Sequence, residues 1–353
     1  MKFRYLGLVA GAVLLAGCGS GGDDKNANAG GSAGSSTSGS GKKLKVGIVF
    51  DAGGKGDKSF NDSAYAGIQR AVKELGVDEK DVDSKTEKDY ETNLSGLAEA
   101  GCDVIFAVGF AQKNALTTVA PKYPNIKFAL IDDELAQPNV SSLVFSEEQG
   151  SFLAGYLAAL TSKTSKIGFV GGKTTPLIKK FETGYIAGAK TANPAIDASG
   201  VKYTESWDDT GAGKAAATVL FSSGCDIIFS AAGRCGLGVI TAAKEQGKFA
   251  IGVDSDQDDQ APGAVLTSMV KHVDEAVFQT IKDVKDNTFK SGTKKFDLKS
   301  KGVGLTEFKY TKDKIGDATI KKLDEVSKDI IDGKIVVPAT PEELPAFLAK
   351  AKK

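Results

Sequence analysis

The chain is poor in histidine, the side chain on which triad hydrolases and zinc proteases depend. Its 353 residues include one histidine, one tryptophan and two methionines. The histidine, His272, has no GxSxG or HExxH motif near it, so the sequence supports neither a triad hydrolase nor a zinc protease. We expect His272 to be a surface or hinge residue.

Net charge is absent and cysteine is scarce. The 45 basic and 45 acidic side chains cancel, which removes the general electrostatic case for a nucleic acid or an anionic membrane surface as partner. Besides Cys18, the chain has Cys102, Cys225 and Cys235. This odd number does not indicate a disulfide framework in an exported protein. A single Cys225–Cys235 bridge and three buried thiols both stay open.

The N-terminus has the order of a secretory signal. Two basic residues precede the apolar run Leu6 to Leu15, which is too short to span a bilayer, and small residues precede Cys18. That arrangement resembles a lipobox, so we expect residues 1–17 to be a signal peptide and Cys18 to carry a lipid. Residues 18–42, rich in Gly, Ser and Ala, predict a flexible tether. The expected location is the extracytoplasmic face of the cell membrane.

Strands and helices alternate after the tether. The apolar, β-branched run Leu44 to Phe50 predicts a strand, and Ser63 to Leu75 carries apolar residues at helical spacing. The same rhythm predicts further helices at Thr92–Ala100, Gln112–Ala120, Phe152–Leu160, Thr183–Thr191, Gly213–Ser222, Gly238–Glu245 and Val273–Val284. It predicts further strands at Val104–Val108, Lys127–Ile131, Lys166–Val170, Val201–Ser206, Asp226–Ser230, Phe249–Val253 and Val265–Met269, with strand character in Lys295–Tyr310 and a helical stretch at the end. Alternation of this kind indicates parallel sheets covered by helices.

The α/β unit occurs twice. Gly101-Cys102-Asp103-Val104-Ile105-Phe106 and Gly224-Cys225-Asp226-Ile227-Ile228-Phe229 are nearly identical, and each follows a predicted helix. The fold class is therefore α/β, with two doubly wound parallel-sheet lobes joined by a multi-strand hinge. We expect a first lobe of residues 43–147 plus about 271–295, a second lobe of 148–270 plus about 296–335, and a C-terminal tail of 336–353.

Carboxylates, aromatic rings and glycines follow the ends of the predicted strands, where open α/β sheets bind ligands. Such a set suits a neutral ligand with a planar ring and hydroxyl groups. Phe60 precedes a helix, so a helix-entry staple on the core is the alternative for it. We expect four other polar residues to be solvated or capping: Asp57, Lys58, Asp208 and Asp258. The candidates at strand ends are Asp51, Phe60, Gly109, Phe110, Asp132, Trp207, Gly233 and Asp254.

Other chemistries fit these loops poorly. The glycine-rich loop after the first strand has neither GxxxxGK[ST] nor GxGxxG spacing, so no nucleotide cofactor is expected. The run Asp254 to Asp259 alternates oxygen donors but lacks the glycine and glutamate of a calcium loop, so no metal is expected. Two facing carboxylates could act as a glycosidase pair, and the sequence does not give their separation.

Several ordered motifs resemble one known family. They are Val46 to Asp51, Asp57-Lys58-Ser59-Phe60-Asn61-Asp62, Gly150-Ser151-Phe152-Leu153-Ala154-Gly155, Gly252-Val253-Asp254-Ser255-Asp256-Gln257 and Leu266-Thr267-Ser268-Met269-Val270-Lys271. Together they resemble the basic membrane protein family of substrate-binding lipoproteins, which includes purine nucleoside receptors of ABC importers. The resemblance implies a type I periplasmic-binding fold that closes on a nucleoside, without catalysis, and delivers it to a membrane permease.

The resemblance also implies roles for individual residues. Phe60 would stack on the base, with Asn61 and Asp51 bonding base edges. Asp254 and Lys271 match positions that hold ribose hydroxyls. Gly233 and Asp132 fall in cleft loops of the same kind. The candidates for the second face of the base are Trp207, then Phe110 and Phe229.

One residue departs from the family pattern, and it keeps the ligand class open. Arg234 stands where a smaller residue is expected, so it either enters or flanks the cleft or points to solvent. If it pointed inward, an anionic ligand would fit. The alternatives to a nucleoside receptor are therefore a binding protein for a sugar or an anionic metabolite, serving transport or sensing, and a lipid-anchored nucleosidase or glycosidase. Nothing indicates an obligate oligomer.

Overall fold

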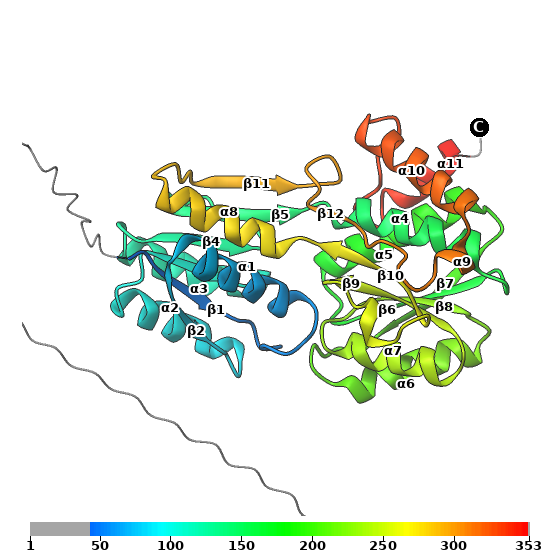
Figure 1. Cartoon of the computed structure of the whole chain (residues 1–353), viewed down its shortest axis with the longest axis horizontal. Coiled ribbons are helices and arrows are strands. Elements are labelled where there is room, and N and C mark those ends of the chain that lie inside the picture. Colours follow the sequence, from blue (N-terminus) through cyan, green and yellow to red (C-terminus); the bar gives the residue numbers. More distant parts are fainter. Residues whose placement is uncertain (1–42, 352–353) are drawn as a thin grey trace, which may run out of the picture. The chain divides into compact units, whose positions relative to one another are not determined.

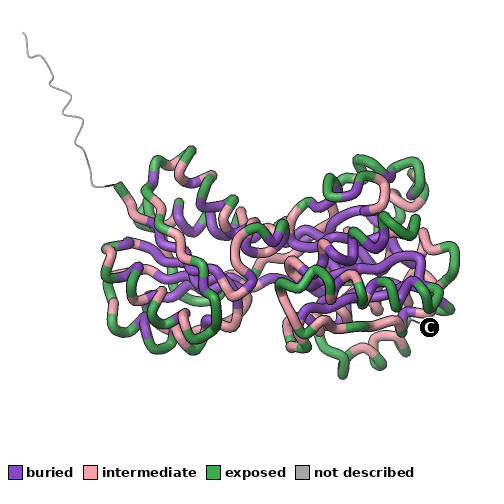
Figure 2. The backbone as a smooth tube through the Cα atoms, turned by 90° about the horizontal axis from the view of Figure 1, so that it is seen from below, coloured by how far each residue is buried: buried purple, intermediate pink, exposed green. Residues whose placement is uncertain are grey.

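The computed structural model describes residues 43–351 and shows two α/β lobes, each built on a six-stranded sheet (Figure 1). The expected signal peptide, the lipid attachment at Cys18 and the tether at 18–42 lie outside the described residues. Buried residues run through the strands of both lobes, and exposed residues lie on the helices and loops around them (Figure 2). The predicted α/β class with two parallel-sheet lobes is confirmed.

The first lobe contains a fully parallel sheet in the order β2-β1-β3-β4-β5-β11. Its strands are β1 (Lys45–Val49), β2 (Asp78–Val82), β3 (Val104–Ala107), β4 (Lys127–Ile131), β5 (Val140–Phe145) and β11 (Gly292–Phe296). Its helices are α1 (Phe60–Leu75), α2 (Tyr90–Glu99), α3 (Lys113–Val119) and α8 (Val273–Lys285), with 3-10 turns η1 (Glu87–Asp89), η2 (Phe110–Gln112) and η3 (Ala120–Lys122). Alternate strand residues point to opposite faces, so Ile48 packs with α1 and α8 while Val49 packs with α2 and α3.

The second lobe repeats this plan in the order β7-β6-β8-β9-β10-β12. Its strands are β6 (Lys166–Gly171), β7 (Asp197–Tyr203), β8 (Ile227–Ala231), β9 (Phe249–Asp254), β10 (Val265–Lys271) and β12 (Val303–Leu305). Its helices are α4 (Glu147–Thr161), α5 (Pro176–Ala192), α6 (Thr210–Ser222) and α7 (Cys235–Glu245), with η4 (Asp258–Gln260) after β9. Only the last strand differs in direction, because β12 pairs antiparallel with β10 whereas β11 pairs parallel with β5.

The repeated sequence motif forms the same turn in both lobes. Gly101 and Gly224 have φ angles of 75° and 100°, in the left-handed region that favours glycine. In the first lobe Asp103 Oδ2 accepts from Lys45 N at 2.8 Å, and in the second Asp226 Oδ2 accepts from Lys163 N at 2.6 Å. Each carboxylate therefore ties the start of the third strand to the chain entering the first strand of its own sheet. The predicted duplication is confirmed at this level of detail.

The chain passes between the lobes at three places. Ser146 alone separates β5 from α4, His272 alone separates β10 from α8, and residues 297–302 join β11 to β12. His272 lies in one of these crossings, where its Nδ1 is 3.3 Å from Asp274 Oδ1. Three crossings side by side are the multi-strand hinge that the fold class implies.

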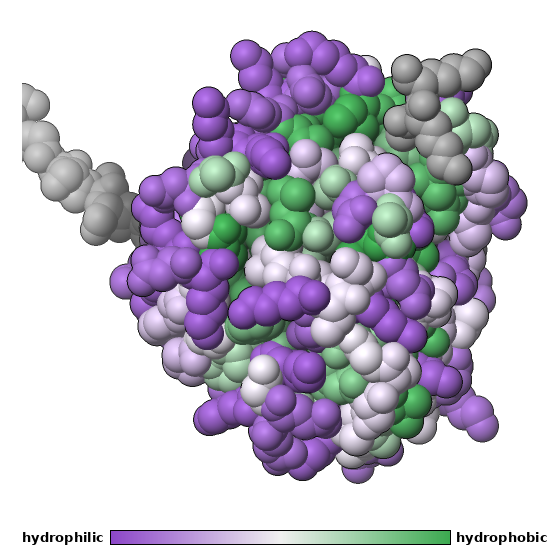
Figure 3. Space-filling view, turned by 90° about the vertical axis from the view of Figure 1, so that its right-hand side faces the viewer, coloured by the Kyte–Doolittle hydropathy of each residue, from purple (hydrophilic) through white to green (hydrophobic). Residues whose placement is uncertain are grey.

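Helices at the C-terminus pack on the second lobe. They are α9 (Lys312–Ile315), α10 (Asp317–Ile331) and α11 (Leu344–Ala351). Leu323 of α10 packs against Leu157 of α4, and the ring of Phe347 lies edge-on to Phe152 with centroids 6.1 Å apart. Figure 3 views the molecule from the end of the second lobe, where apolar residues are exposed between hydrophilic ones.

Some elements differ from the sequence expectation. The strands β2 and β5 were not predicted; β2 reads DEKDV, a charged edge strand without apolar alternation. Helix α5 begins at Pro176, seven residues before the predicted start, with Thr175 as its N-cap accepting from Ile178 N. Strand β7 ends at Tyr203, so the predicted strand over 201–206 extended too far.

Candidate ligand-binding site

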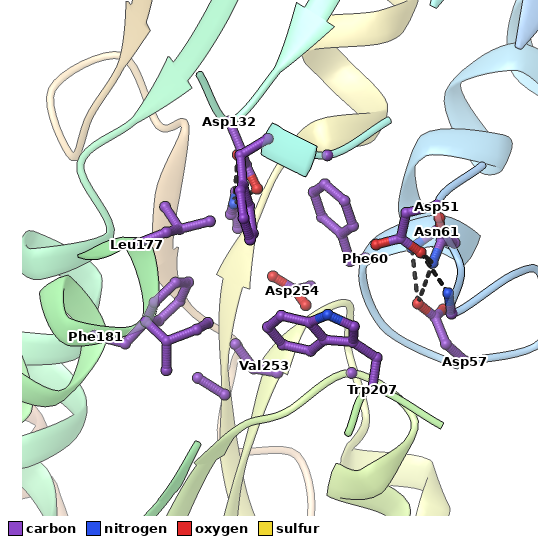
Figure 4. A pocket seen from close by; sticks show the side chains of 17 residues that line it. Asp51, Asp57, Phe60, Asn61, Asp132, Leu177, Phe181, Trp207, Val253 and Asp254 are labelled. Carbon is purple, nitrogen blue, oxygen red and sulfur yellow. Dashed lines mark hydrogen bonds and ion pairs between the residues drawn. The ribbon is translucent and has the colours of Figure 1, made fainter. Parts of the chain in front are cut away.

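A cavity lies where the loops at the C-terminal ends of the two sheets face each other, partly open to solvent (Figure 4). Loops after β1, β3, β4, β7 and β8 supply part of its wall, and the start of α1, helix α5 and the ends of β8, β9 and β10 supply the rest. The location follows from the topology, since parallel strands place all their carboxyl ends at one edge.

The structure brings the ligand-contact candidates together. Each of the following residues lines this one cavity: Asp51, Phe60, Asn61, Gly109, Phe110, Asp132, Trp207, Gly233, Asp254 and Lys271. Their roles toward a ligand stay predictions. Phe229 is different, because it is fully buried in the core among Phe169, Phe181 and Tyr185. Its nomination for a base-stacking role was therefore wrong.

The loop between β1 and α1 carries a preorganised set of acceptor oxygens. Asn61 Nδ2 donates to Asp51 Oδ1 at 2.9 Å and to Asp57 Oδ2 at 3.1 Å. Gly53 N also donates to Asp51 Oδ1, at 2.8 Å. These bonds leave Asp51 Oδ2 for a ligand donor, and Asn61 Oδ1 is buried without a hydrogen-bond partner among the described residues.

Asp57 lines the cavity, whereas the sequence predicted it only as a solvated or capping residue. Its carboxylate accepts from the backbone amides of Ser59, Asn61 and Asp62 at 2.9 to 3.1 Å, so it caps the first turn of α1. It is only 2 % exposed. The predicted capping role of Asp57 is therefore correct, and the prediction that its side chain is solvated is wrong. The cap fixes the two neighbours, Phe60 and Asn61, whose side chains face the cavity.

Burial perturbs the acidity of Asp51. It raises the pKa of this carboxyl to about 6, against the donors from Asn61 and Gly53 that favour the ionised form. Asp51 is therefore ionised and able to accept hydrogen bonds at neutral pH, but it loses that ability in mildly acidic solution.

Two aspartates occupy matching places after the fourth strand of each sheet. Asp132 follows β4 with φ 74°, and Asp254 ends β9 with φ 64°. Aspartate tolerates this left-handed region better than most residues do, and strained backbone of this kind gathers at functional sites. Asp254 Oδ2 accepts from Ser59 Oγ at 2.5 Å. Burial raises the pKa of Asp254 to about 6, against the attraction of Lys271.

Lys271 supplies the one ammonium group that lines the cavity. Its Nζ lies 2.6 Å from Asp132 and 3.2 Å from Glu147 Oε1, and the three side chains are 2 %, 4 % and 1 % exposed respectively. Burial lowers the pKa of Lys271, but Asp132 and Glu147 outweigh it and raise that pKa above its ordinary value. Nζ also lies 5.0 Å from the ring centroid of Phe60. Glu147 begins α4 at a crossing between the lobes, so this cluster joins the site to the hinge.

The second lobe supplies most of the apolar wall. Leu177 and Phe181 of α5 lie across the cavity from Phe60 and Asp51 (Figure 4). Trp207 comes from the loop after β7, and its indole packs on the backbone of Gly172. A Cβ atom on Gly172 would lie 2.2 Å from that ring, so only glycine leaves room for the indole.

Leu177, Phe181 and Glu147 were not predicted as site residues. All three lie on helices, where their apolar or first-turn acidic positions look like ordinary core and helix-start residues. The loop after β6, which leads into α5, is a strand end for which the sequence analysis predicted no ligand contact.

Arg234 flanks the cavity and does not line it. Its Nη2 donates to the carbonyl oxygens of Lys55 at 2.7 Å and Gly53 at 3.4 Å. The side chain therefore neither enters the cavity nor points to solvent. The premise for an anionic ligand is absent, because the charged groups lining the cavity are four aspartates and one lysine.

The remaining alternatives fare as follows. Cys102, Cys225 and Cys235 are buried and unbridged. Within residues 43–351, no group of three or more His, Cys, Asp or Glu residues is placed to hold a metal ion. Asp258 is neither solvated nor a helix cap: it is 3 % exposed and accepts from Ser268 Oγ at 2.8 Å and Thr306 Oγ1 at 2.9 Å. Lys58 and Asp208 are exposed, as expected.

Comparison with known proteins gives one consistent result. The model of the family described as "ABC transporter substrate-binding protein PnrA-like" (Bmp) matches residues 44–341. The chain is 37 % identical to a CD4+ T-cell-stimulating antigen of Listeria monocytogenes, over 95 % of this chain and 97 % of that one. It is 36 % identical to the ABC transporter nucleoside-binding protein BmpA of Lactococcus lactis, over 84 % and 89 %. A solved ABC transporter solute-binding protein from Aeropyrum pernix superposes with a TM-score of 0.79 and 31 % identity, covering 87 % of this chain and 99 % of that one.

Proposed function

Because the chain belongs to the basic membrane protein (Bmp) family of PnrA-like ABC transporter substrate-binding proteins, we propose that it captures a purine nucleoside in the cavity between its lobes. Members of this family bind a small molecule outside the cytoplasm and serve a transporter permease, and they are not enzymes. The nucleoside, the delivery to an importer and the mode of anchoring are the parts that we propose.

The observation that supports a nucleoside is the excess of acceptors beside aromatic rings. Asp51 Oδ2 and the buried Asn61 Oδ1 offer two acceptors on one side of the cavity. A ligand that brings neighbouring N–H donors, as the edge of guanine or hypoxanthine does, satisfies acceptors that would otherwise be desolvated without a partner. The flat face of Phe60 and the indole of Trp207 are available to the ring.

The other end of the cavity suits a sugar. Asp132, Asp254 and Lys271 lie close enough for Lys271 to interact with both carboxylates. Carboxylates accept from ribose hydroxyls, and an ammonium group donates to them. We therefore propose a base end at Asp51 and Asn61 and a ribose end here; the Lactococcus lactis relative is named as nucleoside-binding.

A sugar alone or an anion is less well matched. A sugar lacks the neighbouring N–H donors that would satisfy Asp51 and Asn61, and an anion would meet Asp51, Asp57, Asp132 and Asp254. The negative charge of an anion would be repelled by these carboxylates in a partly buried cavity.

Membrane attachment is a separate part of the proposal. Between residues 43 and 351 no helix has the length and apolar character that a membrane crossing requires. From the N-terminal sequence pattern we propose a signal peptide at 1–17, a lipid on Cys18 and a tether at 18–42, and we also propose a monomeric state. Labelled palmitate should enter the wild-type chain in a lipoprotein-producing host and not enter Cys18→Ala, and equal incorporation would remove the anchor.

The decisive experiment is calorimetric titration of the full chain after unfolding and refolding to strip bound ligand. The panel is guanosine, inosine, adenosine, cytidine, the free bases and ribose. Micromolar or tighter binding is expected for the purine nucleosides and weaker binding for ribose and cytidine. Phe60→Ala should weaken the nucleosides by about 1 to 3 kcal/mol. No binding across the panel, or equal binding of ribose and guanosine, would overturn the nucleoside while leaving the family assignment intact.

A further inference from the structure

Arg234 forms hydrogen bonds between the lobes, although its side chain does not line the cavity. It stands in the loop between β8 and α7 of the second lobe, and both its acceptors, Gly53 O and Lys55 O, belong to the loop between β1 and α1 of the first. None of the three chain crossings passes through either loop. The contact therefore exists only while the lobes are together.

The local structure of the second lobe does not require an arginine here. Arg234 occupies the N-cap position of α7 without a side-chain capping bond, and its positive charge lies at the helix end that disfavours cations. In the repeat defined by the two Gly-Cys-Asp turns, the matching residue of the first lobe is Ala111. Arg234 Nε is buried and has no hydrogen-bond partner among the described residues. The second lobe gives Arg234 no favourable local contact. Its stabilising contacts are therefore the hydrogen bonds to the first lobe.

The acceptor loop connects Arg234 to the ligand-binding wall through Gly53, which lines the cavity, while the arginine side chain does not line it. Gly53 accepts from Arg234 through its carbonyl and donates through its amide to Asp51 Oδ1. Gly56, with φ 87°, lies beside the guanidinium, because a Cβ built there would be in van der Waals contact with Nη2 at 3.6 Å. Arg234 thus holds the segment that carries Asp51 on one side and leads to Phe60 on the other.

Other hydrogen bonds also join the lobes, and one of them involves a residue of the cavity wall, Asp254. Ser59 Oγ donates to Asp254, Ser255 Oγ donates to Ser59 O at 2.9 Å, and Gln257 Nε2 donates to Lys58 O at 2.8 Å. An exposed ion pair, Lys173 with Glu87 at 3.7 Å, also spans the two lobes. Arg234 differs from all of these, because it combines a full charge, partial burial and no place in the wall.

We propose that Arg234 is a closure latch: it stabilises the closed, ligand-holding arrangement of the lobes by bonding the Gly53 and Lys55 carbonyls, without contacting the ligand. This role rests on the proposed function, in which the cavity closes on a small molecule. A latch acts on the closed state alone, so it lowers the dissociation rate of every ligand by the same factor. It does not set selectivity, because it reads no ligand group.

The test compares Arg234→Ala with wild type by stopped-flow dissociation of guanosine, inosine and adenosine from the full chain. Loss of charge-assisted hydrogen bonds should raise each dissociation rate by about ten- to a hundredfold. The association rate and the ratios between ligands should stay within about twofold of wild type. Arg234→Lys, which keeps the charge without the planar fork, should fall between the two.

The matched control is Lys173→Ala. It removes the exposed ion pair between the same lobes, with side chains 39 % and 63 % exposed, and it should change the rates by about twofold or less. Ligand-dependent changes in Arg234→Ala would overturn the latch and assign Arg234 to recognition. Unchanged dissociation rates, or a loss equal to that of Lys173→Ala, would overturn it as well.

A second measurement separates this inference from the nucleoside. Hydrogen exchange of peptides covering residues 51–60, in the protein as isolated with its captured ligand, should be faster in Arg234→Ala and unchanged in Lys173→Ala. If wild type binds no nucleoside, the proposed ligand fails, and exchange alone judges the latch. Equal exchange in this segment for Arg234→Ala and wild type would then overturn it.

Discussion

The two lobes share one strand plan and yet line the cavity with a different balance of side chains. The first contributes most of the polar groups, Asp51, Asp57, Asn61 and Asp132, beside the rings of Phe60 and Phe110. The second contributes most of the apolar groups, Leu177, Ile178, Phe181, Trp207 and Val253, beside Asp254 and Lys271. The residue after the first strand shows the contrast. The runs Lys45-Val46-Gly47 and Lys166-Ile167-Gly168 occupy the same places, so Asp51 of the first lobe corresponds to Gly172 of the second, which carries the Trp207 indole.

The difference teaches which part of a repeated fold is free to vary. The turns at Gly101 and Gly224 keep the same φ region and the same backbone bonds because both sheets need them. The strand-end loops bear no such constraint and have diverged into an accepting wall and an apolar wall. Asp132 and Asp254 are the exception: they match in place and in conformation, and together with Lys271 they mark where the two walls meet.

The largest effect is expected where the walls meet. Lys271→Met leaves Asp132 and Glu147 buried without their cation and should lower the free energy of unfolding by about 3 to 5 kcal/mol. Urea denaturation of the ligand-free protein measures it. Lys180→Met is the control, since Lys180 also contacts Glu147, at 3.3 Å, but its side chain is 35 % exposed. Similar losses in both variants would show that the cluster at Lys271 is not special.

Removing acceptors from either lobe should affect different parts of a nucleoside. Asp51→Ala should weaken guanosine and guanine alike by about 1.5 to 3 kcal/mol, because it loses hydrogen bonds from the base. Asp254→Ala should weaken guanosine and leave guanine nearly unchanged, because its proposed partner is ribose. Calorimetry with both ligands measures the two differences. Identical profiles for the two variants would remove the division into a base end and a ribose end.

A side chain at the position that matches Asp51 should disturb the apolar wall. In Gly172→Ala the new Cβ would lie 2.2 Å from the Trp207 ring, so the indole must move, and affinity should fall by about 1 to 2 kcal/mol. Gly304→Ala is the control, as nothing lies within 4 Å of a Cβ built there. Wild-type affinity in Gly172→Ala would mean that Trp207 does not contact the ligand.

Lower pH should move stability and binding in opposite directions. Burial raises the pKa of Asp51 and Asp254 from 3.8 to about 6, so the folded state binds these protons more tightly than the unfolded chain does. Between about pH 7.5 and 5.5 these two groups should therefore add roughly 1.5 kcal/mol to the stability of the ligand-free fold as the pH falls. Affinity for guanosine should decrease over the same range, because protonated carboxyls accept fewer hydrogen bonds. Asp51→Asn with Asp254→Asn should reduce both changes, which urea denaturation and calorimetry at the two pH values will show.

The sequence predicted the strand-end aspartates of the site better than the residues around them. Asp51, Asp132 and Asp254 could be found because each follows an apolar strand, and parallel strands put such residues at one edge. Phe181 could not be found, because an apolar residue on an amphipathic helix has the same pattern whether it faces the core or a cavity. The partners of Arg234 lie about 180 positions away in sequence, and no local pattern encodes a contact at that separation.

The position of Trp207 has a spectroscopic consequence. It is the only tryptophan in the chain, and it lies in the cavity wall against Gly172. Excitation at the red edge of protein absorption therefore reports from this one place, without background from a second indole. Ligands that stack on the ring or exclude water from it will change its emission directly. Tryptophan fluorescence of the unlabelled protein therefore measures the fraction of protein that holds ligand.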